Sequence, residues 1–186
     1  IKEYGYFSYA VNEALHLSEE EEKMIERIMN NIREEYETSI DNFSQEVMVS
    51  QLDLLLNYCN RFYNRQFITR KNVKNNLLSR FDDSLTEYFQ SEKVKFSELP
   101  SVHFFADKLS VSPNYLNDML KSLTGQTTQQ HIHGKLIEQA KELLSTTSLS
   151  VSEIAYQLGF GYPQSFNKLF KKKTNITPHQ FRNSFN

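Results

Sequence analysis

Three consecutive lysines, Lys171, Lys172 and Lys173, give the sequence its densest positive charge. A lysine run alone is typical of a solvated surface, but the same charge also binds the phosphates of a polyanion. The charge balance of the chain favours the second interpretation. Residues 1–100 contain 12 Lys+Arg and 18 Asp+Glu, whereas residues 101–186 contain 9 and 5. We therefore expect the basic C-terminal half to meet a polyanion.

Two other residue pairs in this half have spacings known from metal sites and enzymes. His131 and His133 could ligate a metal ion, but residues two apart on a helix point to different faces, and no thiol or carboxylate stands at ligand spacing. Ser165 and Lys168 match the spacing of a serine nucleophile motif without its partner motifs. No nucleophile, base and oxyanion site can be assembled, so we predict no catalysis, no cofactor and no metal site.

The elements that position these residues should be helices. The chain has 186 residues, 39% hydrophobic and 24% charged, with only 5 Gly and 4 Pro. This composition predicts an all-α protein of one domain or two small ones, not a turn-rich sandwich or barrel. Cys59 is the only cysteine, which excludes an intrachain disulfide. Because the sequence lacks a signal pattern and an apolar run of about 20 residues, we expect a cytoplasmic protein.

A short leading segment precedes the first expected helix. Residues 1–11 are rich in aromatic side chains and could form a strand, although a single strand needs a sheet to bury it. The chain begins at Ile1 and not at Met, so we interpret residues 1–17 as the remnant of an upstream sensor domain. Ser18 followed by Glu21 has the pattern of a capping box and marks the start of a helix.

Apolar residues at helical spacing then predict three helices, over about 19–38, from Asp41 or Ser44 to about 63, and over about 72–92. The second helix presents residues spaced like the seam of paired helices: Met48, Leu52, Leu55, Cys59 and Phe62. Two interpretations stay open. The helices form a three-helix packing unit, or part of their surface within residues 41–92 is the seam of a homodimer.

The C-terminal half contains an internal repeat. Residues 104–132 align with residues 153–182, and each copy predicts a short helix, a tight turn and a second helix. Gly159 stands where the first helix of its copy ends, a place that favours positive φ, and Ser110 occupies that place in the other copy. A helix over about 128–145 joins the copies. It spans roughly 27 Å, near the roughly 34 Å between successive major grooves on one face of B-DNA.

The segment SVSEIAYQLGFGYPQSFNKLFKKKTNITPHQFR at 150–182 is close to a family signature. Through it, residues 97–186 resemble the DNA-binding domain of the AraC/XylS family of bacterial transcription regulators, and residues 40–96 are similar to the helical linker before that domain in some members. The resemblance implies two helix-turn-helix modules joined by a long helix and preceded by a helical linker or dimerisation region. The implied units are residues 1–17, 18–96 and 97–186, with modules at about 102–125 and 151–174 around a connecting helix at about 128–145.

The resemblance also implies that the second helix of each module enters a major groove. The DNA-binding residues implied are Asn114, Asn117, Asp118, Lys121, Pro163, Gln164, Asn167, Lys168, Lys171 and Lys172. Asn and Gln can bond an adenine edge, and Lys can reach guanine or phosphate. Asp118 departs from the family pattern, because many members carry a basic residue there and a carboxylate repels phosphate. We therefore expect the first module to bind DNA more weakly than the second, or to read fewer bases.

The implied function is a sequence-specific regulator that binds double-stranded promoter DNA. In the family's usual mode it would be an activator that contacts RNA polymerase. The alternative is a helical interaction module whose two helix-turn-helix units contact protein and not DNA. The basic cluster on the second module favours DNA. No residue identifies the effector ligand.

Overall fold

The computed structural model describes residues 4–37, 41–69, 71–90 and 99–185, without the side chains of residues 68–75. Within these ranges all regular structure is helical, as the composition predicts. Two short 3₁₀ helices lead into the α-helices. The elements are η1 (Gly5–Ser8), η2 (Val11–Glu13), α1 (Glu19–Glu37), α2 (Ser44–Thr69), α3 (Lys71–Gln90), α4 (Val102–Leu109), α5 (Pro113–Thr124), α6 (Thr128–Thr146), α7 (Val151–Gln157), α8 (Pro163–Thr174) and α9 (Pro178–Asn183).

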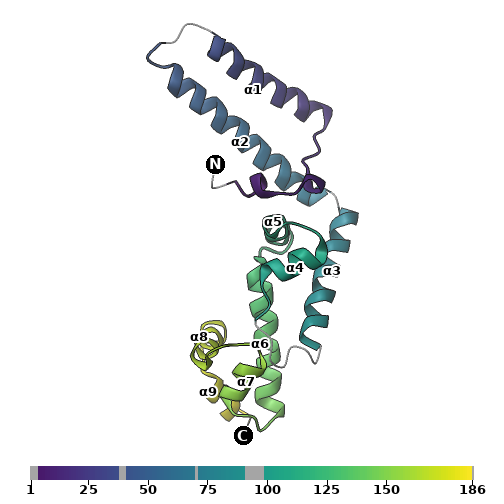
Figure 1. Ribbon diagram of the computed structural model, residues 1–186, viewed down its shortest axis with the longest axis vertical. Coiled ribbons are helices and arrows are strands. Elements are labelled where there is room, and N and C mark those ends of the chain that lie inside the picture. Colours follow the sequence, from purple (N-terminus) through teal and green to yellow (C-terminus); the bar gives the residue numbers. More distant parts are fainter. Residues whose placement is uncertain (1–3, 38–40, 70, 91–98, 186) are drawn as a thin grey trace.

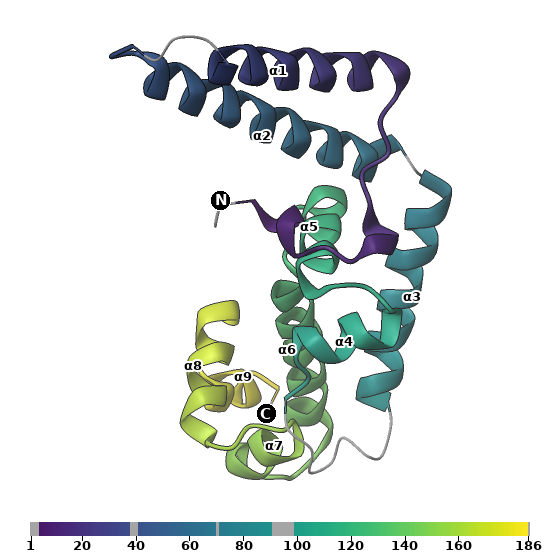
Figure 2. The ribbon, with the colours of Figure 1, turned by 45° about the horizontal axis from the view of Figure 1, so that its top comes forward.

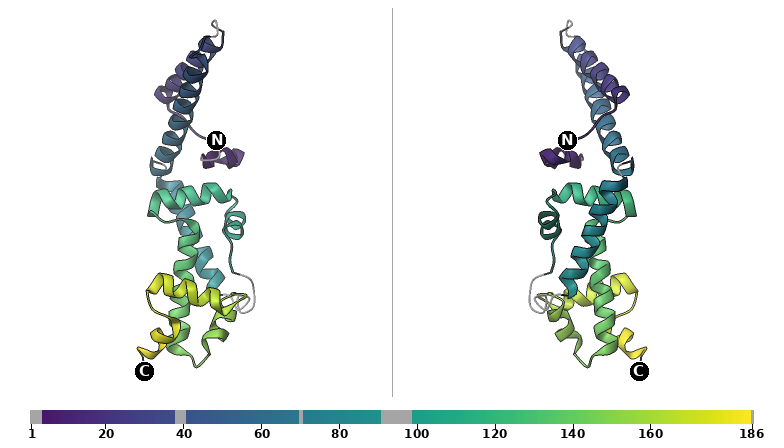
Figure 3. Two further views of the ribbon diagram at one scale, coloured as in Figure 1. Left: turned by 90° about the vertical axis from the view of Figure 1, so that its left-hand side faces the viewer. Right: turned by 90° about the vertical axis from the view of Figure 1, so that its right-hand side faces the viewer.

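The helices form an elongated molecule with a projecting hairpin at one end (Figure 1). Helices α1 and α2 pack against each other and extend away from the rest, while α7, α8 and α9 gather at the opposite end (Figure 3). The capping box that begins α1 is present: the backbone N–H of Ser18 donates to Glu21, and that of Glu21 donates to the Ser18 hydroxyl. Ile28 is the one residue of α1 that is buried.

Helix α3 packs mainly against α4 and also contacts α2 and α6 (Figure 2). The expected three-helix unit is therefore wrong as a separate packing unit, because the buried side chains of α3 share a core with the C-terminal half. The buried side chains Phe81 and Leu85 of α3 belong to the same core as Phe105 of α4 and Leu136 of α6. The expected boundary between residues 96 and 97 lies outside the described residues, as do residues 91–92 of the expected third helix. Structurally, α3 is part of the core of the first helix-turn-helix module.

The two predicted helix-turn-helix modules are α4–α5 and α7–α8, with α6 between them. A single apolar core runs through both modules and includes Leu116, Leu120, Ile154 and Phe170. In each module the alanine of the first helix is fully buried, which lets the two helices approach closely: Ala106 and Ala155.

The described part of the leading segment, from residue 4 onward, contains no strand, so the strand expected within residues 1–11 is wrong for residues 4–11. Gly5–Ser8 and Val11–Glu13 are single turns of 3₁₀ helix. The described residues offer no sheet to which a strand could add. The aromatic side chains pack instead on helices: Tyr6 stacks on Tyr63 of α2, with ring centroids 5.2 Å apart.

The turn between the helices of each module requires a left-handed residue. Ser110 adopts φ 57° and Gly159 adopts φ 86°. A residue with a Cβ atom is strained in this region, whereas glycine is not. The sequence prediction at both positions is therefore confirmed, and Ser110 stores strain that Gly159 does not.

Replacing Ser110 by glycine should raise the free energy of unfolding by about 0.5–1 kcal/mol, because relief of left-handed strain exceeds the added backbone entropy of the unfolded chain. Urea denaturation measures the change. Gly159→Ser is the matched reverse substitution and should lower the free energy of unfolding. A Ser110→Gly variant no more stable than the parent would contradict this assignment of strain.

Candidate nucleic-acid interface

Helix α8 carries the most exposed set of predicted DNA-binding residues. Pro163 begins the helix, and Phe166 and Phe170 anchor its inner face in the core. The remaining predicted residues follow the 3–4 spacing of one helix face. All of them are exposed: Gln164, Asn167, Lys168, Lys171 and Lys172. The structure therefore brings these five together on one outward surface.

The charge on α8 is concentrated at its C-terminal end. Lys171, Lys172 and Lys173 occupy the last turn, where the helix dipole favours cations. Among the residues that the structure describes, no carboxylate forms an ion pair with them or with Lys168. Burial, and then the nearby Lys173 and Lys172, lower the pKa of His133, so this imidazole is neutral at pH 7 and the fixed charge comes from the lysines.

Helix α5 also places its predicted residues on one face, but this face is only partly open. Asn114 and Lys121 are exposed. Asn117 is half-buried, and its Oδ1 accepts the backbone N–H of Thr128 at 3.3 Å, which ties α5 to the first turn of α6. Asp118 accepts the hydroxyl of Tyr9 at 2.7 Å. The two predicted recognition helices therefore present different surfaces to solvent.

Sequence reasoning missed the residues that contact α5 from the N-terminal segment. Tyr9 bonds Asp118, and the carboxylate of Glu13 bonds Ser112, the N-cap of α5. These pairs are 109 and 99 residues apart, beyond the reach of any local pattern. The one signal was Asp118 itself, an acidic residue on a face expected to meet phosphate.

The histidine pair is not arranged as a metal site. In the described ranges, no group of three or more His, Cys, Asp or Glu could hold a metal ion. His131 instead lies 2.8 Å from the Thr124 hydroxyl through Nε2, with its ring edge-on to Phe81 of α3. Likewise, no described helix is both long and apolar enough to cross a membrane.

Comparison with known proteins also identifies helix-turn-helix structure in the C-terminal half. Residues 105–184 match a family described as a helix-turn-helix domain. The chain is 30% identical over 129 residues to histidine kinase P4 of Formosa agariphila, covering 67% of this chain and 9% of that protein. It is 36% identical over 87 residues to the HTH-type transcriptional activator RhaS of an Enterobacter species, covering 47% of this chain and 31% of that protein.

One solved structure is also similar to this chain. It is the C-terminal domain of the two-component response regulator yesN from Fusobacterium nucleatum, 33% identical with a TM-score of 0.48, over 60% of this chain and 98% of that one. The chain spans less than a third of the length of histidine kinase P4 and of RhaS. Through residues 105–184, it belongs to the AraC/XylS family of helix-turn-helix transcription regulators.

Proposed function

We propose that this chain binds promoter DNA sequence-specifically as part of a transcription regulator, with α5 and α8 as its two recognition helices. The main support for this proposal is the outer face of α8. It combines side chains that can bond base edges, Gln164 and Asn167, with lysines that no described carboxylate neutralises. A surface built only for protein contact would have no need of such unpaired charge.

The connecting helix supports a two-groove geometry. Helix α6 has 19 residues, which gives a length of about 28 Å. A capping box formed by Thr127 and Gln130 begins it, and buried Ile132, Leu136 and Leu144 hold it in the core. A rigid helix of this length suits two modules that enter adjacent major grooves on one face of the duplex.

The predicted residues divide into two roles. Gln164, Asn167 and Lys168 lie in the first half of α8, the part of a recognition helix that contacts base edges. Lys171 and Lys172 lie in the last turn, where contact with phosphate supplies affinity without sequence information. On α5 we propose Asn114 and Lys121 as the corresponding contacts, with Asn117 and Asp118 also on that face.

The domain belongs to a family of DNA-binding regulators and not of enzymes, in agreement with the predicted absence of catalysis. The relative RhaS is named a transcriptional activator. As part of the proposal we extend activation, through contact with RNA polymerase, to this chain. The site of action would be the cytoplasm, where the promoter DNA of a bacterium lies.

Selection of bound duplexes from a random pool tests the proposal. The full chain should enrich a motif with one or two short blocks, and its affinity should fall steeply as the salt concentration rises, because lysine–phosphate contacts release counterions. Lys168 should be required for the enriched block but not for weak binding to scrambled DNA. Absence of binding, or equal binding of every sequence, would support the protein-interaction alternative.

Self-association is a separate prediction, and α2 is the surface proposed for it. Because the apolar face of α3 lies in the core, we place the expected homodimer contact within residues 41–92 on α2. This helix exposes Val49, Leu52 and Leu54. Sedimentation should show a concentration-dependent dimer, and Leu54→Glu should weaken it at least about tenfold by burying an unpaired charge. Gln129→Glu on α6 is the matched control and should not weaken the dimer. A monomer at all concentrations would contradict the prediction.

A further inference from the structure

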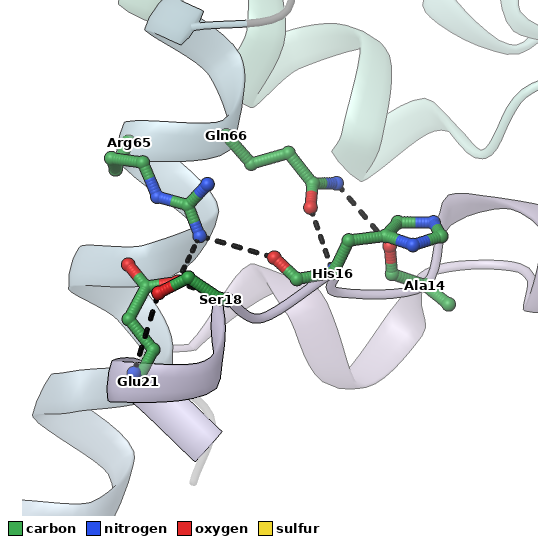
Figure 4. Close-up of polar contacts among 6 residues, drawn as sticks. All are labelled: Ala14, His16, Ser18, Glu21, Arg65 and Gln66. Carbon is green, nitrogen blue, oxygen red and sulfur yellow. Dashed lines mark hydrogen bonds and ion pairs between the residues drawn. The ribbon is translucent and has the colours of Figure 1, made fainter. Parts of the chain in front are cut away.

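Residues 4–17, which we call the N-terminal strap, lie between the hairpin and the first helix-turn-helix module (Figure 2). The C-terminal end of the strap is hydrogen-bonded to α2. The side-chain amide of Gln66, only 3% exposed, donates to the carbonyl of Ala14 at 3.2 Å and accepts the backbone N–H of His16 at 2.8 Å. Arg65 donates to the carbonyl of His16 at 3.0 Å (Figure 4). The strap and α2 are thereby joined through both backbone and side chains.

The strap is also fixed to the first turn of α5. The carboxylate of Glu13, only 3% exposed, accepts the backbone N–H of Ala10, the backbone N–H of Ser112 and the hydroxyl of Ser112. Ser112 is also the N-cap of α5 and accepts the backbone N–H of Tyr115. A buried carboxylate with three donors beside a helix N-terminus is well compensated. This contact therefore holds the strap firmly in place.

The middle of the strap covers the face of α5 that is predicted to read DNA. The hydroxyl of Tyr9 donates to Asp118 at 2.7 Å, and its ring packs edge-on against Tyr115 and Tyr63. Burial, and then the hydrogen bond to Asp118, raise the pKa of Tyr9, so the hydroxyl stays protonated as a donor. The backbone of Gly5 approaches so closely that a Cβ atom there would lie 2.5 Å from the Asp118 carboxylate.

A helix that reads bases must bring its side chains within hydrogen-bonding distance of the groove floor. The ring of Tyr9 and the backbone of Gly5 occupy that space over Asp118. Helix α8 has no such cover. Its predicted DNA-binding residues between Gln164 and Lys172 are all exposed. The predicted face of α8 is thus open, whereas that of α5 is covered at Asp118 and open at Asn114 and Lys121.

We propose that the N-terminal strap is an autoinhibitory element that blocks DNA reading by α5 until the contacts of Tyr9 and Glu13 with this helix break. The inference rests on the proposed function of α5 and α8. It also explains Asp118: the carboxylate that is unfavourable beside phosphate is the acceptor that holds the strap closed. With the strap closed, the chain engages DNA through α8 alone.

Tyr9→Phe is the sharpest test because it removes the hydroxyl donor and keeps the ring that packs on Tyr115. The parent and the variant would each select duplexes from the same random pool at fixed salt. The parent should enrich the block read by α8, and the variant should enrich that block with a second one. On the two-block duplex the variant should bind about tenfold more tightly, the effect of losing one hydrogen bond to a charged group.

Two controls separate release of the N-terminal strap from general effects on DNA binding. Tyr4→Phe removes a strap hydroxyl that bonds Asn57 of α2, not α5, and should bind like the parent. Asp118→Asn alone is ambiguous, since it also relieves repulsion of phosphate. In a double-mutant cycle, the benefits of Tyr9→Phe and Asp118→Asn should be less than additive, because both release the same contact. Full additivity would overturn the proposal.

The outcomes distinguish the strap from the proposed function. Failure of Tyr9→Phe to gain a second block, with Lys168-dependent binding of the first block intact, would overturn autoinhibition and leave DNA reading standing. Absence of any selected sequence for both proteins would overturn both. Hydrogen exchange gives an independent readout: on the two-block duplex, amides of residues 4–17 should lose protection while those of α5 gain it. Retained protection of the strap on that DNA would also overturn autoinhibition.

Discussion

Replacing Phe81 by alanine should lower the free energy of unfolding by about 3–5 kcal/mol, the cost of removing a large aromatic ring from a packed core. The ring is fully buried on α3. It packs edge-on against Phe105 of α4, with centroids 5.5 Å apart, and against His131 of α6, with centroids 5.8 Å apart. Its loss would open a cavity where α3 meets the first helix-turn-helix module.

Urea denaturation of the full chain measures this loss. Tyr36→Ala is the control, because Tyr36 is an aromatic residue 76% exposed on α1 and its truncation should cost less than about 1 kcal/mol. Phe81→Ala should also weaken DNA binding, since α4 and α6 position α5. Similar losses for the two variants would contradict the assignment of α3 to the core of the DNA-binding domain.

Replacing Lys168 or Gln164 by alanine should weaken binding to the selected duplex by about 1–3 kcal/mol each, which is roughly a 5- to 150-fold loss. Both side chains are exposed on the first half of α8, and neither contributes to the core. The loss should therefore come from the interface with DNA and not from unfolding. Thermal denaturation of each variant should match that of the parent.

A comparison of selected and scrambled duplexes assigns the role of each residue. Loss restricted to the selected duplex identifies a contact with a base, whereas equal loss on both reassigns Lys168 to the backbone. Lys173→Ala is the matched control in the last turn of α8, and its modest loss should be the same on both duplexes. Unchanged affinity of both Lys168→Ala and Gln164→Ala on the selected duplex would exclude α8 as the recognition helix.

The C-terminal half could be predicted from the sequence because its signals are local. Caps such as Ser112, turn residues such as Gly159 and the 3–4 spacing of apolar residues act within a few positions. The common face of α8 follows from the same spacing. Each of these signals sits within the element it specifies, so the helix bounds and the outward residues follow without knowledge of tertiary contacts.

The N-terminal half could be predicted only in part. Helical periodicity gives an apolar face but does not name the partner that covers it, so Phe81 could be placed in a helix and not against Phe105. The strap was beyond prediction for a related reason. Tyr9 and Glu13 form their contacts with α5 across about a hundred residues, and an aromatic-rich segment read locally resembles a strand.

The two proposed recognition helices differ in how much of their surface serves the fold. Helix α5 has its main contacts with η1, α2, α4 and α6, whereas those of α8 are with α7 and α9. A change at Asp118 or Ser112 therefore disturbs bonds inside the protein, while a change at Gln164 or Asn167 disturbs none that the structure describes. Over evolutionary time, we therefore expect descendants of this chain to acquire new target sequences by substitution on α8 far more readily than on α5.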